Sequence, residues 1–305
     1  MKAEDLTFYC AFPGEHNLKQ YTTDDISIVA FDGTTEFRGK YFEIATEPTD
    51  KDQYVESVES LIRELRQREG KTVISRLQVV KSSKPIENVI VEYFKRNPET
   101  FRFAIESNET GLWFGATPEL LAEIDVENES VKTMALAGTR KAGNAEPWDL
   151  KNAEEHKFVT QFIINTLSHY CTDIKVSDER EIRFGDIEHL CTPIEGRLTG
   201  NWGKLLKELS PTPAVGGQPR DEALKDINRL EHHNRYLYGG YTTVRRDGKI
   251  YAWVNLRLAF CRPDGNGNLI YNIYSGGGIT ADSDPEDEWE EAEAKARPLI
   301  ESITN

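Results

Sequence analysis

The fold is decided above all by one C-terminal stretch, Ser275-Gly276-Gly277-Gly278-Ile279 followed by Ser283-Asp284-Pro285-Glu286-Asp287-Glu288-Trp289-Glu290-Glu291-Ala292-Glu293-Ala294-Lys295. Asp284 is a good N-cap residue and Pro285 suits the first position of a helix, so we expect a helix to begin here. Three consecutive glycines between a strand and a helix allow the backbone to approach a ligand closely. The stretch therefore predicts a strand, a glycine turn and a helix beside a binding site.

This predicted helix carries charges next to its apolar side. Glu288, Glu291 and Lys295 fall within about a 60° arc of its surface. The apolar side consists of Trp289, Ala292, Ala296, Leu299, Ile300 and Ile303. Two interpretations stay open. Acidic residues in a first turn stabilise the helix dipole, and Glu291 with Lys295 forms an ordinary i,i+4 pair; alternatively, the three charges belong to a half-buried site.

The composition is that of a soluble, acidic protein. The 305 residues are 38% hydrophobic and carry a formal net charge of −15. This length suffices for one large domain, and the negative charge repels nucleic acids and anionic membranes, so neither is an expected partner. No apolar run approaches the roughly 18 residues of a membrane helix, and residues 1–5 lack the apolar core of a signal peptide, which predicts a cytoplasmic location.

Four widely spaced cysteines fit buried free thiols better than zinc ligands or disulfides: Cys10, Cys171, Cys191 and Cys261.

The order of the predicted elements indicates an α+β fold with large antiparallel sheets, because strands arrive as hairpins and not as alternating βαβ units. Helices are expected at 55–68, 86–96 and 148–170, and strands at 71–80, 100–107, 111–116, 120–124, 130–137, 241–245, 249–260 and 266–275. The residues 108–110 and Asp247-Gly248 are hairpin signals. We expect one domain over residues 1–305.

Two charged residues stand at positions that favour burial. Glu155 lies on the buried line of the helix at 148–170, where a carboxylate is costly unless it is paired or binds a metal. A contact with the helix dipole is an equal alternative. Arg257 stands among Tyr251, Trp253 and Asn255 on one face of a predicted strand. It is either a structural ion pair or a carboxylate anchor.

Taken together, motifs over about three quarters of the chain resemble the chorismate-utilising enzymes, which include anthranilate, aminodeoxychorismate, isochorismate and salicylate synthases. The motifs are Lys71-Thr72-Val73-Ile74-Ser75-Arg76, Ala116-Thr117-Pro118-Glu119, Leu136-Ala137-Gly138-Thr139-Arg140, Glu155-His156, Pro211-Thr212-Pro213-Ala214-Val215-Gly216-Gly217, Leu237-Tyr238-Gly239-Gly240, Leu256-Arg257 and Gly276-Gly277-Gly278-Ile279. The acidic helix that ends its charged part at Lys295 completes the set.

The resemblance implies an α/β sandwich with the active site between two large sheets, and Mg²⁺ as the cofactor that holds the ring carboxylate of chorismate. Glu155, Glu288 and Glu291 match the metal-binding positions. Residues that match substrate-binding positions are Thr139, His189, Tyr238, Arg257, Gly276, Gly278 and Lys295.

Lys71 and Glu119 match the catalytic positions. Family members that add water resemble this chain in having Lys at position 71, whereas ammonia-using members usually have Gln there. A Lys near a buried site loses its proton more easily and can act as a base toward water. Glu119 matches the general acid that protonates the departing ring hydroxyl. Ala137 replaces the nucleophilic Lys of aminodeoxychorismate synthases, so that activity is disfavoured.

The resemblance therefore implies an isomerase, isochorismate synthase, of the menaquinone or siderophore type. It also implies a monomer that needs no glutaminase subunit. Salicylate synthase, an anthranilate synthase-like enzyme and a non-catalytic chorismate-binding subunit stay open as alternatives. The chain departs from the family in a shortened part before Lys71, in Asn152 where some relatives have a second acidic residue, and in Ala135 where Pro is common.

Overall fold

The protein is described here from a computed structural model, which places residues 6–10, 19–22, 27–28, 47–107 and 111–305. The predicted hairpin turn at 108–110 and the side chain of Cys10 lie outside the described residues. The other three cysteines are buried free thiols, as expected: Cys171, Cys191 and Cys261. None of the described helices is long and apolar enough to cross a membrane.

Two antiparallel sheets form the centre of the molecule, which confirms the predicted fold class. The nine-stranded sheet has the order β10-β11-β8-β7-β14-β13-β1-β2, with β9 paired to β11. Its strands are β1 (Leu6–Cys10), β2 (Lys19–Thr22), β7 (Leu120–Asp125), β8 (Ser130–Lys141), β9 (Cys171–Val176), β10 (Arg180–Phe184), β11 (Ile187–Leu198), β13 (Tyr241–Arg246) and β14 (Lys249–Val254). The seven-stranded sheet has the order β12-β4-β16-β15-β6-β5-β3. Its strands are β3 (Ser27–Ile28), β4 (Lys71–Ser82), β5 (Phe101–Ser107), β6 (Gly111–Thr117), β12 (Gly217–Gln218), β15 (Leu258–Pro263) and β16 (Leu269–Ile279).

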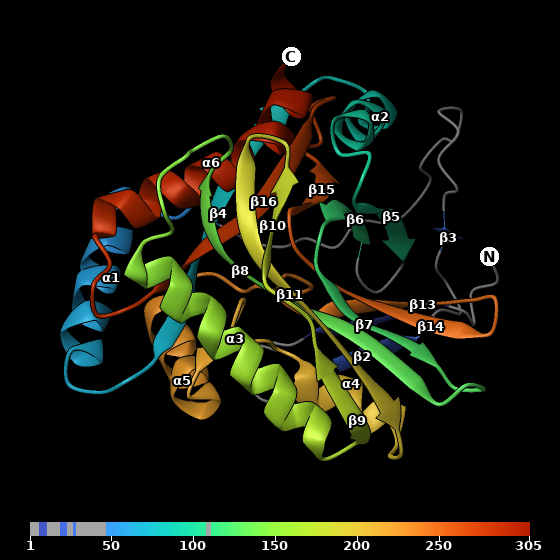
Figure 1. The fold of residues 1–305 in the computed structure, drawn as a ribbon. Coiled ribbons are helices and arrows are strands. Elements are labelled where there is room, and N and C mark those ends of the chain that lie inside the picture. Colours follow the sequence, from blue (N-terminus) through green and yellow to red (C-terminus); the bar gives the residue numbers. More distant parts are fainter. Residues whose placement is uncertain (1–5, 11–18, 23–26, 29–46, 108–110) are drawn as a thin grey trace.

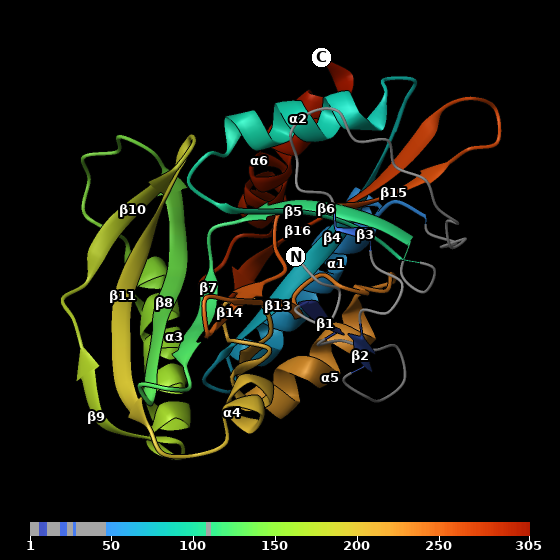
Figure 2. The same cartoon turned by 90° about the vertical axis from the view of Figure 1, so that its right-hand side faces the viewer.

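Helices cover the outer faces of both sheets. They are α1 (Lys51–Leu65), α2 (Ile86–Arg96), α3 (Leu150–Ser168), α4 (Trp202–Leu209), α5 (Arg220–Leu230) and α6 (Pro285–Thr304). In Figures 1 and 2, α3 runs along β8 and β11 of the larger sheet, whereas α6 runs along β16 of the smaller one. Val159, Ile163 and Leu167 of α3 are buried against that larger sheet. Asp284 caps α6 and Pro285 opens it, as the sequence predicted.

An aromatic core lies between the two sheets. Trp113 of β6 and Tyr274 of β16 stack with ring centroids 5.8 Å apart, and Tyr274 stacks in turn on Tyr238 at 5.8 Å. Val244 of the larger sheet belongs to the same buried cluster. The face of β16 that carries Tyr274 is therefore turned toward the interior between the sheets, where a ligand pocket also opens.

Three local predictions were wrong in instructive ways. The glycines at 276–278 are not a turn but part of β16, which pairs with β4 as far as Ile279. The predicted strand at 249–260 is two strands in different sheets, joined by residues 255–257, so Arg257 is not on a strand face. Its backbone has φ of 49°, a left-handed conformation that interrupts the alternation. The third prediction, made from the residues Ala137-Gly138-Thr139-Arg140, is a tight turn at the end of a strand. These residues instead lie within β8, at a register shift against β11, with Gly138 at φ of 73°.

Candidate active site

A pocket between the two sheets brings together eight of the twelve residues that the sequence placed in the site. They are Glu119, Thr139, Glu155, His189, Tyr238, Arg257, Gly276 and Lys295. Its wall also contains Leu136, Ala137, Ala214, Leu256 and Tyr274, none of which the sequence assigned to the site. The pocket residues come from both sheets, from the β6–β7 and β14–β15 connections, and from α3 and α6.

Lys71 forms a buried ion pair with Glu155, which lines the pocket. Lys71 begins β4, its side chain is fully buried, and its Nζ lies 2.6 Å from Oε1 of Glu155 on α3. Burial lowers the pKa of Lys71, although the negative charge of Glu155 opposes this. Burial alone would raise the pKa of Glu155, but the positive charges of Lys71 and Lys151 outweigh it and the pKa is lowered. Glu155 is thus a charged, paired carboxylate, which decides against a simple dipole contact.

The glycines of β16 leave room for the carboxylates. A Cβ atom on Gly278 would lie 2.5 Å from Oε1 of Glu155, and one on Gly277 would lie 2.6 Å from Oε2 of Glu288. Both distances are shorter than ordinary Cβ contacts, so a side chain at either glycine would force the carboxylate beside it to move. Close approach to the glycine backbone was predicted for a ligand, and the structure shows it for the acidic side chains that surround the strand.

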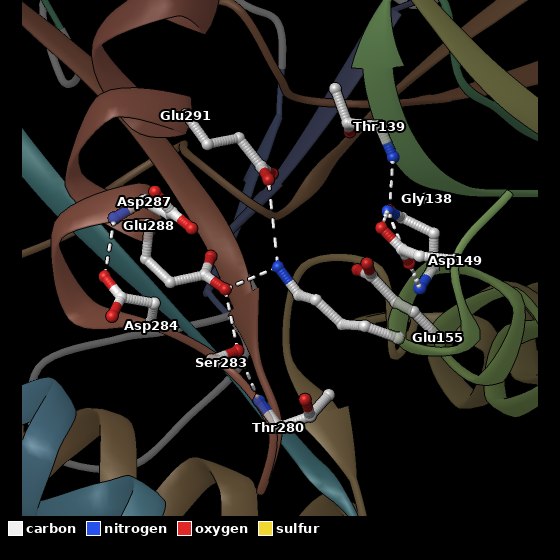
Figure 3. Close-up of polar contacts among 12 residues, drawn as sticks. Gly138, Thr139, Asp149, Glu155, Thr280, Ser283, Asp284, Asp287, Glu288 and Glu291 are labelled. Atoms are coloured by element: carbon white, nitrogen blue, oxygen red, sulfur yellow. Dashed lines mark hydrogen bonds and ion pairs between the residues drawn. The ribbon is translucent and has the colours of Figure 1, made fainter. Parts of the chain in front are cut away.

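The acidic residues of α6 face α3. In Figure 3 the carboxylates of Glu288 and Glu291 turn toward that of Glu155. Nζ of Lys151, on the first turn of α3, lies 2.5 Å from Oε1 of Glu288 and 3.9 Å from Oε2 of Glu291. Lys295 lies 2.7 Å from Oε1 of Glu291 and donates a hydrogen bond of 2.9 Å to the carbonyl of Gly276. Six side chains therefore form a lysine–glutamate cluster of balanced charge: Lys71, Lys151, Lys295, Glu155, Glu288 and Glu291.

Glu288 is the carboxylate of this cluster with an unused oxygen. Its side chain is 1% exposed, Ser283 and Lys151 donate to Oε1, and Oε2 is buried with no hydrogen-bond partner. Burial and the neighbouring Glu291 raise the pKa of Glu288 to about 7. Among the described residues, no three His, Cys, Asp or Glu side chains are gathered closely enough to surround one metal ion. The donor types suit Mg²⁺, but lysine ammonium groups hold the carboxylates in the arrangement seen here.

Glu119 lines the same pocket, on the connection between β6 and β7. It is 3% exposed, and the hydroxyl of Thr212 donates to Oε1 at 3.3 Å. Burial raises the pKa of Glu119 to about 7, even though Thr212 and the charges of Lys71 and Arg257 favour the ionised form. Glu119 can therefore carry a proton near neutral pH, as a general acid must.

Arg257 is held in the pocket by its neighbours. Its Nη2 lies 2.9 Å from Nε2 of His189, whose Nδ1 lies 2.8 Å from the carbonyl of Gly138. Burial and the charge of Arg257 lower the pKa of His189 to about 3, so the imidazole is neutral. The Nδ1–H then donates to Gly138 and Nε2 accepts from Arg257. The carbonyl of Arg257 itself accepts a 2.8 Å hydrogen bond from the hydroxyl of Tyr93, which fixes a backbone in a strained region.

Asn152 contacts the strand that carries Thr139 rather than the lysine–glutamate cluster. Its Oδ1 accepts a 2.8 Å hydrogen bond from the backbone N–H of Thr139, and its Nδ2 donates to Asp149, the N-cap of α3. Gly138, Thr139 and Asp149 surround this contact in Figure 3. The amide therefore orients the β8 side of the pocket.

Four predicted site residues do not line the pocket: Lys71, Gly278, Glu288 and Glu291. These four residues lie next to Glu155 or Lys295, or belong to the same lysine–glutamate cluster, and Glu155 and Lys295 do line the pocket. Lys151 and Thr212 also belong to the site, although the sequence did not indicate it. Lys151 stands four residues before Glu155, the same spacing that drew attention to Glu291 and Lys295. Thr212 lies in the Pro-Thr-Pro-Ala motif, where nothing in the sequence indicates its hydrogen bond to Glu119.

Comparison with known proteins shows the family to which the chain belongs. A family model described as "Chorismate binding enzyme" matches residues 14–304. The isochorismate synthase MenF of Bacillus subtilis is 27% identical over 312 residues, which is 96% of this chain and 61% of that protein. The isochorismate synthase EntC of Escherichia coli K12 is 30% identical over 257 residues, or 75% of this chain and 61% of that one. Anthranilate synthase component 1 of Saccharolobus solfataricus is 28% identical, over 95% of this chain and 70% of that one.

Solved structures agree on the fold. DhbC of Bacillus anthracis, a candidate 2,3-dihydroxybenzoate-specific isochorismate synthase, superposes with a TM-score of 0.73 at 26% identity, over 88% of this chain and 77% of that one. MenF of Escherichia coli, at 24% identity and a TM-score of 0.74, shares the fold over 88% of this chain and 65% of that chain. The chain spans about three fifths of the length of the curated isochorismate synthases that it matches.

Proposed function

Because this chain belongs to the family of chorismate-binding enzymes, we propose that it is an isochorismate synthase, an isomerase that converts chorismate into isochorismate. The observation that carries the proposal is a pair of buried ionisable groups, Glu119 in the pocket wall and Lys71 beside Glu155 of that wall. Burial lowers the pKa of Lys71, which favours loss of its proton, and burial raises the pKa of Glu119 to about 7, which favours retention of its proton near neutral pH. The similarity to MenF and EntC supports the same activity.

In the proposed reaction, Lys71 takes a proton from a water molecule, which attacks C2 of the ring. The double bonds shift, and the hydroxyl at C4 leaves with the proton of Glu119. The product is an isomer of the substrate, because one water is added and one is lost. Arg257 and Tyr238 would hold the enolpyruvyl carboxylate, with Arg257 oriented by His189. Thr139, His189, Gly276, Gly278 and Lys295 would complete the substrate contacts.

We propose Mg²⁺ as the cofactor, held by Glu155, Glu288 and Glu291. The support is the unpartnered, buried Oε2 of Glu288, a carboxylate donor set, and ammonium groups that now stand where cationic charge is needed. When bound, the ion would neutralise and hold the ring carboxylate. We further propose that the protein acts as a cytoplasmic monomer without a glutaminase subunit, since water and not ammonia is the nucleophile.

The test is to incubate purified protein with chorismate and MgCl2, with and without ammonium, and to identify the products by liquid chromatography and mass spectrometry. We expect an isomer of unchanged mass that requires Mg²⁺ and does not respond to ammonium. Glu119→Gln is the matched control, because it should remove the product and so exclude a contaminating enzyme. Salicylate would instead support a salicylate synthase, and anthranilate an ammonia-using enzyme. No product, with binding of chorismate retained, would support a non-catalytic subunit.

A further inference from the structure

Lys151 is a half-buried cation that the proposed reaction does not use. It lies on α3 and does not line the pocket, yet its Nζ stands between Glu288 and Glu291 of α6. Its side chain is 20% exposed. Holding an ammonium group this far from water is costly unless it is paired with opposite charge. The two carboxylates supply that charge and would otherwise repel each other.

The three lysines of the lysine–glutamate cluster differ in how firmly they are held. Lys71 is fully buried and paired with Glu155. Lys295 is tied both to Glu291 and to the carbonyl of Gly276. The contacts described for Lys151 are with carboxylates alone, and a fifth of its side chain reaches solvent. Lys151 is therefore the lysine that can leave most easily.

We propose that Lys151 is a resident counter-cation of the metal site, which competes with Mg²⁺ for Glu288 and Glu291 and so weakens metal binding. This inference rests on the proposed Mg²⁺ site. Mg²⁺ binds carboxylate oxygens at about 2.0–2.1 Å. An ammonium group that already lies 2.5 Å from Oε1 of Glu288 would repel it strongly at that range. Lys151 must swing toward solvent before the ion can enter.

The same contact has a second role in the absence of metal. Lys151 comes from the helix that covers the larger sheet, whereas Glu288 and Glu291 come from the helix that covers the smaller one. The lysine thus joins the two halves of the site until the metal replaces it. Removing its charge should lower stability without metal and raise the stabilisation that metal provides.

The test measures Mg²⁺ binding directly, without turnover. Lys151→Met is titrated with MgCl2 by calorimetry at constant ionic strength, and its melting temperature is recorded with and without Mg²⁺. We expect it to bind Mg²⁺ at least about fivefold more tightly than the wild type, because one nearby positive charge is removed. Its melting temperature should be lower without metal and should rise more when Mg²⁺ is added. Lys151→Gln, which retains hydrogen-bond donors, gives a second neutral variant if the first folds poorly.

Two further variants serve as controls. Lys151→Arg keeps the charge, and Lys157→Met removes an exposed lysine of the same helix. The Mg²⁺ dissociation constants of both controls should stay within about twofold of the wild-type value. Unchanged or weaker Mg²⁺ binding by both neutral Lys151 variants, with the wild type binding normally, would overturn this inference alone. Absence of Mg²⁺ binding in the wild type and in both neutral variants would overturn the proposed metal site and this inference together.

Discussion

The raised pKa of Glu119 means that this residue makes the folded protein less stable at neutral and alkaline pH. Its ordinary value is 4.5 and its value in the fold is about 7. Between these limits the folded state binds more protons than the unfolded state, so the free energy of unfolding falls as the pH rises through this window. The difference of about 2.5 pH units corresponds to about 3 kcal/mol at pH 8 and to less than about 1 kcal/mol at pH 5.

We therefore expect Glu119→Gln to be more stable than the wild type by about 3 kcal/mol at pH 8, and nearly equal to it at pH 5. The amide is neutral at both pH values, and its oxygen can still accept the hydrogen bond from Thr212. Urea unfolding followed by circular dichroism at the two pH values measures the difference. Other titrating groups are common to both proteins and cancel. The same variant should lose turnover, because it cannot donate the proton.

The control for this comparison is Glu127→Gln, at an exposed position in the turn between β7 and β8. It should shift the free energy of unfolding by less than about 0.5 kcal/mol at either pH. If Glu119→Gln stabilises equally at pH 5 and pH 8, or destabilises at pH 8, then burial does not control the ionisation of Glu119 and its role as a proton donor at neutral pH loses its physical basis.

Two other substitutions probe the interior of the site. Lys71→Met should abolish turnover. It should also lower the free energy of unfolding by about 3 kcal/mol, because it leaves Glu155 buried beside an apolar group. The double variant Lys71→Met/Glu155→Met should recover most of that lost stability. Urea unfolding of the two single variants and the double variant tests this, and simple addition of the single losses would refute the coupling. Gly278→Ala should reduce kcat/KM by about 100-fold or more, because the new Cβ would lie 2.5 Å from Oε1 of Glu155 and 3.2 Å from Nζ of Lys71. Steady-state assays beside Gly203→Ala, a control glycine on α4, measure the effect, and near-normal activity of Gly278→Ala would show that the close approach is not needed.

The sequence predicted correctly those features that depend only on residues within one helix or strand. The N-cap at Asp284, the helix at 86–96 and the buried position of Glu155 all follow from spacing and residue type, and the structure confirms them. The fold class followed from the succession of hairpins. The family resemblance also predicted that residues from distant elements share one site, and eight of these residues line one pocket.

The sequence could not predict features that depend on an unusual backbone conformation or on contacts between residues far apart in the chain. The alternation from Tyr251 to Phe260 is unbroken in sequence, and nothing in an Arg indicates the positive φ that sends β14 and β15 into different sheets. The glycine triplet looked like a turn because glycine is rare inside strands; here the strand needs residues without side chains to admit Glu155 and Glu288. Ion pairing between Lys71 and Glu155 could not be inferred from spacing, since 84 residues separate them.

That separation has a consequence for how the protein matures. The contacts of the lysine–glutamate cluster span 84 residues between Lys71 and Glu155 and 137 between Lys151 and Glu288. Contacts between such distant segments form late in folding, because the entropy of closing the intervening loops must first be overcome. During synthesis, a nascent chain cannot assemble this site until α6 has emerged from the ribosome. A partly folded species with only one sheet in place would lack part of the pocket wall, because residues of both sheets line the pocket.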